Sequence, residues 1–310
     1  MPRALRIQYE GAMYHVMNRG DRREAICHDD EDRRLFLRTL GQVCEKSGWE
    51  VHAYCLMSNH FHLVVETPEP NLVVGMKWFL GTYTQRFNAR HQLRGHLFAG
   101  RYKALMVDER DRTYLRAVCD YTHLNPERGG LIGKEQALES YPWSSYPEYL
   151  KNPEARPKCL RTDRLLGEHG ILKDNAAGRR EFSRRMELQR SMGEEEGLQG
   201  KIRKSWKLGA EDFMDRLQDH LKGVTRDRHE AASVRESMQV RARCLVEEEL
   251  ARAGITNDEL ATLPKGAEVK IEIARKLRKS TTLTLKEVAL LLHAGHWRSL
   301  ANALAKNMSI

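Results

Sequence analysis

WEVHAYCLMSNHFHLVVE, residues 49–66, contains two apolar segments separated by Ser58 and Asn59. Segments 49–57 and 60–66 have the composition of β-strands, and a Ser-Asn pair suits a tight turn. This pattern predicts a β-hairpin.

The sequence on either side of the hairpin predicts the rest of a sheet. Residues 13–19 alternate with the period of a strand, and 29–48 combine an acidic first turn with apolar residues at helical spacing. Residues 71–91 are typical of a core-packing helix, and 101–108 of a last strand. This order predicts an α+β, ferredoxin-like (split βαβ) antiparallel sheet with both helices on one face. The opposite face is then expected to be free for function.

His60 and His62 lie two residues apart in the second strand of the hairpin. Residues i and i+2 of a strand project from the same face, so the two imidazoles lie side by side. Such a pair is suited to a divalent metal, which would polarise a phosphate for attack by a phenol. The alternative is a pair of exposed histidines on a half-solvated strand.

A further helix is predicted over 110–125, ending before Pro126, because proline disfavours helical backbone in the residue before it. Tyr121 and Asn125 lie about 40° apart around this helix and share a face, whereas His123 points away from Tyr121. Tyr114, two turns earlier, is a rival for the role of functional tyrosine.

Composition narrows the class of partner. The chain has 310 residues, a formal net charge of +9 and a sequence pI of about 9.3, which favours nucleic acid or an acidic membrane surface. No apolar run approaches the roughly 20 residues that span a bilayer, and the N-terminus lacks a signal-peptide pattern, so a cytoplasmic, nucleoid-associated protein is expected. The six cysteines contain no CxxC pair, so no zinc ribbon is indicated.

The second half of the chain has a different pattern. Residues 151–205 are predicted to be a linker and a charged helical segment, and 206–310 a helical C-terminal region. Within that region, 266–307 has a helix-turn-helix pattern, with a helix over 285–293 and a recognition helix over 296–306. An ordinary three-helix packing unit is the alternative.

Several motifs in the first half resemble those of a known family. YCLMSNHFHLVVE (54–66) is followed by GRYKALMV (100–107) and YLRAVCDYTHLNPERGGLI (114–132). In this order they resemble the single-tyrosine HUH transposases, and most closely the REP-associated tyrosine transposases of bacteria. The resemblance covers about residues 1–150, which are therefore predicted to form the HUH nuclease domain.

The resemblance implies a mechanism and its residues. Tyr121 is implied as the nucleophile, with His60, His62 and Asn125 as ligands of Mg²⁺ or Mn²⁺. The implied reaction cleaves single-stranded or hairpin DNA through a 5′-phosphotyrosine link, releases a 3′-hydroxyl and then rejoins strands, in a monomer or homodimer. Thr122-His123 departs from the Ile-Glu-like pair usual in the family, and consequences for packing are expected.

DNA contacts are predicted where basic and aromatic residues alternate near the first and last strands, and on the recognition helix, which would bind flanking duplex. The residues are Arg3, Arg6, Arg22, Arg101, Lys103, Arg298 and Asn302.

Two other classes of protein fit parts of the pattern. A sequence-specific DNA-binding regulator without catalysis would need only the C-terminal module and a basic surface, and would form no covalent adduct. A metal-dependent hydrolase of the barrel type also has HxH, but it needs repeated strand-helix units that the sequence after residue 111 does not show.

Overall fold

The computed structural model describes residues 6–192, 202, 207–210, 212–213, 215–217 and 230–306. The chain divides into two compact units: Met1–Cys44 and Gly48–Leu221 form the first, and most of the second is Lys222–Ile310. Each unit has its own hydrophobic core. The domain limit at residue 150 remains a sequence prediction.

The first unit is built on a sheet of five strands in the order β2-β3-β1-β4-β5. Neighbouring strands among the first four are antiparallel, and the short β5 is parallel to β4. The strands are β1 (Ala12–Arg19), β2 (Glu50–Leu56), β3 (His60–Thr67), β4 (Lys103–Val107) and β5 (Lys207–Leu208). With α1 (Asp30–Ser47) after β1 and α2 (Leu72–His91) after β3, the predicted split βαβ order is confirmed.

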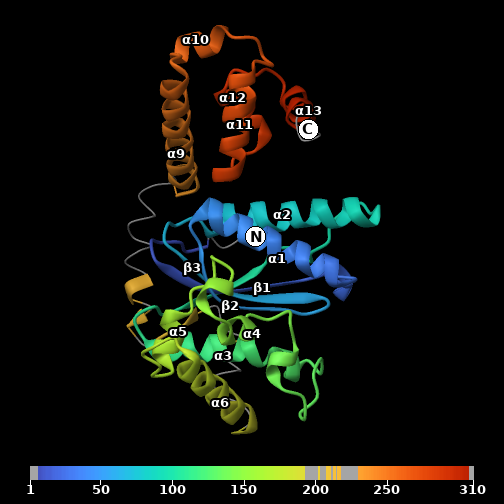
Figure 1. Cartoon of the computed structure of the whole chain (residues 1–310), viewed down its shortest axis with the longest axis vertical. Coiled ribbons are helices and arrows are strands. Elements are labelled where there is room, and N and C mark those ends of the chain that lie inside the picture. The colour runs from blue at the N-terminus through green and yellow to red at the C-terminus, as the bar shows by residue number, and fades with distance from the viewer. Residues whose placement is uncertain are drawn as a thin grey trace. The chain divides into compact units, whose positions relative to one another are not determined.

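Helices cover both faces of this sheet (Figure 1). On one face the Phe61 ring of β3 contacts Phe36 of α1 and Phe79 of α2, at centroid distances of 5.1 and 6.2 Å. Neighbouring His62 points to the other face, where its ring lies 5.8 Å from that of Tyr121 in α3 (Arg112–Arg128). The sequence predicts that the second face is free, but in the structure it carries the helix with the candidate tyrosine.

The sequence predicts that helix α3 ends at residue 125, but the helix continues through Pro126 to Arg128. Proline removes one backbone donor, but this loss falls in the last turn, and only two helical residues follow it. The helix then ends at Gly129, whose N–H bonds to the Asn125 carbonyl at 2.8 Å. At its start, the Asp111 side chain accepts a hydrogen bond from the Thr113 N–H.

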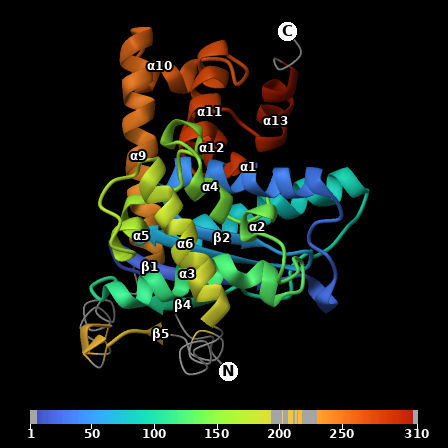
Figure 2. The ribbon, with the colours of Figure 1, turned by 60° about the horizontal axis from the view of Figure 1, so that its bottom comes forward.

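Further helices form a layer on the outer side of α3. These are η2 (Leu138–Ser140), α4 (Tyr146–Leu150), η3 (Pro153–Ala155), α5 (Asp163–Glu168) and α6 (Ala176–Met192). Phe182 of α6 is buried against the rings of His123, Tyr146 and Tyr149, at 5.2 to 6.3 Å. Figure 2 shows α6 lying across α3.

All regular elements of the second unit in its described residues are helices, which confirms the predicted helical C-terminal region from residue 230 on. The start of the predicted region, 206–310, is wrong, because Lys207–Leu208 form β5 in the sheet of the first unit. The elements of the second unit are α9 (Glu230–Ala253), α10 (Asn257–Thr262), α11 (Glu268–Ser280), α12 (Leu285–Leu291) and α13 (Trp297–Lys306). Thr284 and Glu287 form a capping box at the start of α12. The turn before α13 contains His293 and Gly295 with φ of 49° and 75°. Within the described part of the chain, no helix is long and apolar enough to cross a membrane.

Candidate active site

A cleft of about 530 Å³ opens on the sheet face that carries α3. Residues from β1, β3 and β4, the turns beside them and α3 line it: Met17, Asn18, Arg19, Arg23, Asn59, His60, His62, Ala99, Arg101, Lys103 and Tyr121. Three side chains predicted for catalysis or metal binding thus meet in one cleft.

Strand pairing places both histidines of the HxH motif in the cleft. His60 lies opposite Arg19 and His62 opposite Met17 in the antiparallel β1–β3 pair, and the two imidazole centroids are 5.2 Å apart. Burial, and then the charge of Arg19, lower the pKa of His60. His60 is therefore neutral at physiological pH, as a metal ligand must be.

The Nδ1 atom of each histidine is already engaged by a neighbour. His62 Nδ1 lies 3.0 Å from His15 Nε2, and His60 Nδ1 lies 2.7 Å from Asn59 Oδ1. When Nδ1 donates to a neighbour, Nε2 keeps the lone pair that can bind a metal. The two Nε2 atoms are therefore the ligand atoms that this arrangement favours.

His15 is a site residue that the sequence analysis missed. It is fully buried, its ring stacks on His62 at 5.2 Å, and its edge-to-face contact with Tyr121 is 5.9 Å. Burial lowers the pKa of His15 to about 3, so the imidazole is neutral. Its place in the alternating strand was visible in the sequence, but its contact with His62 depends on the register of β1 against β3.

Tyr121 approaches the histidines from α3 of the same chain. Its ring is 5.8 Å from that of His62, and its side chain is largely buried. The rival Tyr114 is only partly buried and does not line the cleft. The structure therefore brings Tyr121, and not Tyr114, to the histidine pair.

The neighbours of Tyr121 on α3 have different environments. Asn125 is buried and does not line the cleft, and within the described part of the chain its Nδ2 has no hydrogen-bond partner. His123 points away, as predicted, and its Nε2 lies 2.8 Å from Ser145 Oγ. Thr122 donates its hydroxyl to the Val118 carbonyl. Thr122 and His123 therefore serve packing.

Four basic side chains, Arg19, Arg23, Arg101 and Lys103, surround the histidines and Tyr121. Their positive charge suits the phosphates of a nucleic-acid strand. Arg23 lies in the short helix η1 (Asp21–Arg23), which is joined to the hairpin turn because Asn59 Nδ2 donates to the Arg23 carbonyl at 3.1 Å.

The other predicted DNA-binding residues lie elsewhere. The Arg6 guanidinium stacks on the Tyr102 ring at 3.5 Å and donates to the Tyr102 carbonyl. Arg22 is exposed but does not line the cleft. Arg298 and Asn302 are exposed on α13, and Arg3 lies outside the described residues.

Comparison with known proteins identifies the family of the first half. Residues 8–124 match the family model described as "Transposase IS200 like". The match contains the whole cleft, and it confirms the resemblance to this transposase family that the motifs of the first half predict. The family match supports a transposase-like role in DNA processing.

A solved structure, titled "Structure of the REP associates tyrosine transposase bound to a REP hairpin", is similar to the chain. The identity is 16% and the TM-score 0.40, and the match covers 48% of this chain and 84% of the other. The comparison with curated proteins gave no match.

Proposed function

We propose that this protein cleaves and rejoins single-stranded DNA through a covalent bond between Tyr121 and a 5′-phosphate, at palindromic or hairpin DNA. The observation that carries the proposal is the meeting of Tyr121, His60 and His62 in one basic cleft. A buried phenol beside two imidazoles that could hold a divalent ion is suited to nucleophilic attack on a phosphodiester.

In the proposed reaction, the Tyr121 phenol loses its proton and its oxygen attacks the phosphorus. The bond from phosphorus to the 3′-oxygen breaks, and this oxygen takes up a proton and leaves as a 3′-hydroxyl. A 3′-hydroxyl, from the same strand or another, then attacks the phosphotyrosine and releases Tyr121. Each step exchanges one phosphodiester for another, so no nucleotide cofactor is needed.

The donor set of the cleft fits a divalent ion, either Mg²⁺ or Mn²⁺. His60 and His62 would hold it through Nε2, because their Nδ1 atoms are engaged by Asn59 and His15. Asn125 is the third ligand that the sequence analysis predicts, through its amide oxygen, and the structure buries it on the same helix as Tyr121 but outside the lining of the cleft. When bound, the ion would draw charge from the scissile phosphate and make it more electrophilic.

Each chain is proposed to act with its own tyrosine. The Tyr121 ring lies 5.8 Å from the His62 ring of the same chain, so an exchange of helices between two copies is not required to complete the site. In this proposal a monomer is active.

The second unit is proposed to bind duplex DNA beside the cut. Two exposed polar side chains of α13, Arg298 and Asn302, follow the turn after α12. This is the position at which a helix-turn-helix recognition helix presents base-contacting residues.

The test is formation of a covalent protein–DNA adduct with a hairpin oligonucleotide labelled at its 3′ end. Because the 5′-phosphate would join the tyrosine, the labelled downstream fragment should migrate with the protein in a denaturing gel. Tyr121→Phe should abolish the adduct, and the matched variant Tyr114→Phe should retain it.

The metal requirement is tested in the same assay. His60→Ala, His62→Ala and EDTA should each remove cleavage, and Mn²⁺ should restore it after EDTA. If wild-type protein binds the hairpin and forms no adduct with either metal, the chain is a DNA-binding regulator and the proposed reaction is wrong.

A further inference from the structure

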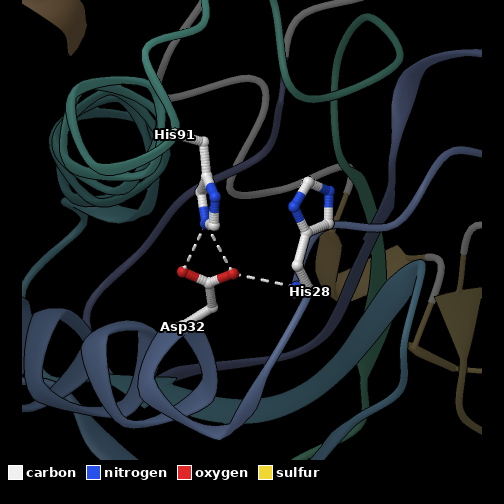
Figure 3. A group of neighbouring side chains, drawn as sticks. All are labelled: His28, Asp32 and His91. Atoms are coloured by element: carbon white, nitrogen blue, oxygen red, sulfur yellow. Dashed lines mark hydrogen bonds and ion pairs between the residues drawn. The ribbon is translucent and has the colours of Figure 1, made fainter.

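A second group of metal-binding side chains lies outside the cleft. His28 precedes α1, Asp32 is in the first turn of α1, and His91 is the last residue of α2. The side chains of Asp32 and His91 point toward each other, and the ring of His28 lies beside that of His91 (Figure 3). The His28 and His91 rings also pack on Phe87 of α2, at 5.0 and 4.5 Å. None of the three residues lines the cleft.

The distances within this cluster suit a shared ion. His91 Nε2 is 2.9 Å from both carboxylate oxygens of Asp32, and one possible ligand atom from each residue lies within 4.8 Å of the others. Neighbouring ligands at about 2.1 Å from a metal are about 3.0 Å apart in octahedral and about 3.4 Å apart in tetrahedral geometry. The His91–Asp32 pair is therefore already spaced as two ligands of one ion.

His28 is free to complete the set. It is exposed, and its ring makes no hydrogen bond with any other part of the chain that the structure describes. Its ring contacts the rings of Phe87 and His91, at 5.0 and 4.6 Å. A small rotation of the His28 side chain brings it toward the ion without breaking a hydrogen bond.

The charge around the cluster favours a cation. Arg90 bonds to Asp29 at 2.7 Å and to Asp32 at 2.6 Å, so two carboxylates face one guanidinium. Hydrogen bonds from Arg90 and the Asp32 N–H lower the pKa of Asp29 to about 2. Burial raises the pKa of Asp32, but bonds from His91, the His28 N–H and Arg90 outweigh it and lower the pKa. Two ionised carboxylates beside one guanidinium leave one net negative charge to attract a cation.

Asp32 has no need of a metal to remain buried. Its hydrogen bonds to His91, Arg90 and the His28 N–H already join the start of α1 to the end of α2. An ion on His91 Nε2 would replace the hydrogen bond of this nitrogen to Asp32 and its contact with Arg90 Nη1 at 3.2 Å. The bonds from Arg90 Nη2 to Asp29 and from the His28 N–H to Asp32 do not involve His91, so they can stay in place.

We propose that His28, Asp32 and His91 form a second metal site, which binds a transition-metal dication of the Zn²⁺ class and joins α1 to α2. Two imidazoles and one carboxylate are donors that Zn²⁺, Co²⁺ and Ni²⁺ accept readily, whereas Mg²⁺ and Ca²⁺ prefer oxygen ligands. The site is independent of the proposed reaction in the cleft.

The experiment removes the cleft ligands first. Full-length His60→Ala/His62→Ala protein, without an affinity tag, is titrated with Zn²⁺ by calorimetry, and bound zinc is counted by elemental analysis after dialysis. This protein should still bind Zn²⁺ and should unfold at a higher temperature with the metal. Adding His28→Ala should remove one equivalent and the thermal shift, whereas adding His96→Ala, at an exposed histidine outside the cluster, should change neither.

His28→Ala and His96→Ala are also compared in otherwise wild-type protein, so that the test does not depend on correct folding of the His60→Ala/His62→Ala variant. In the wild-type background, His28→Ala should lower bound zinc by one equivalent and leave Mn²⁺-dependent DNA cleavage unchanged. Equal zinc content in the His28→Ala and His96→Ala proteins would overturn the proposal, and so would a well-folded His60→Ala/His62→Ala protein that binds no Zn²⁺.

Discussion

The basic lining of the cleft leads to a quantitative prediction for DNA binding. Arg19, Arg23, Arg101 and Lys103 line the cleft, whereas Arg22, adjacent to Arg23 in the chain, does not. For single strands, each neutralised phosphate contributes about 0.7 to the slope of log affinity against log salt. Four contacts predict a slope of about −2.8, so raising NaCl fourfold weakens binding roughly 50-fold.

Binding of a single-stranded oligonucleotide is measured by fluorescence anisotropy at NaCl concentrations from about 50 to about 200 mM, which is a fourfold range. Tyr121→Phe protein is used so that no DNA is cut. Replacing any one of the four cleft residues by Gln should reduce the magnitude of the slope by about 0.7. The weakening of binding caused by a fourfold rise in NaCl is then about 2.6-fold smaller than in the parent protein.

Arg22→Gln is the matched control because Arg22 and Arg23 both have left-handed backbone, with φ of 51° and 66°. Their substitution therefore perturbs the same turn in the same way. If Arg22→Gln lowers the slope and Arg23→Gln does not, the DNA follows a different surface. A protein with all four cleft residues replaced and an unchanged slope would refute the cleft as the binding surface.

Three further predictions concern buried side chains. His15→Ala should weaken Mn²⁺ binding by about 10- to 100-fold, because His62 loses its Nδ1 partner, and His15→Gln should retain more; calorimetry measures both. Burial, and then the charge of His169, lower the pKa of His123 in the folded protein to about 3. In the unfolded chain the His123 imidazole binds a proton at about pH 6.5. The folded protein is therefore not destabilised by His123 above about pH 6.5, and it loses stability as the pH falls toward about 3. At pH 5 the free energy of unfolding is lower by about 2 kcal/mol. In urea unfolding curves, His123→Asn should remove this pH-dependent loss. Lys270→Met should destabilise the second unit by about 2 kcal/mol, because the buried Nζ donates to two backbone carbonyls at 3.0 Å, whereas Met at exposed Lys286 should have little effect on thermal unfolding.

The fold of the first sheet was predictable because its signals are local. Alternation of apolar residues and the Ser58-Asn59 turn specify the β2–β3 hairpin, and the helices have their own apolar stripes. Helix α3 shows the limit of local rules. Pro126 signals a helix end, but in the last turn it removes a single donor, and the helix continues to Arg128.

The site was predictable where a motif fixed it and not where tertiary pairing did. His60 and His62 share a strand, and Tyr121 belongs to a recognisable motif. His15 meets His62 only through the register of β1 on β3. In the same way, the contact of His91 with Asp32 depends on how the end of α2 packs against the start of α1.

The position of Tyr121 depends on residues beyond the family match, which ends at residue 124. One side of α3 presents Tyr121 to His62, and the other is held by later segments. His123 bonds to Ser145, and the fully buried Asp120 pairs with His169 at 2.9 Å. Because a buried polar group that loses its hydrogen-bond partner costs about 1–3 kcal/mol, these two contacts oppose a shift of α3. The segment that follows the transposase motifs therefore belongs to the framework of the candidate active site, even though it contributes no residue to the cleft.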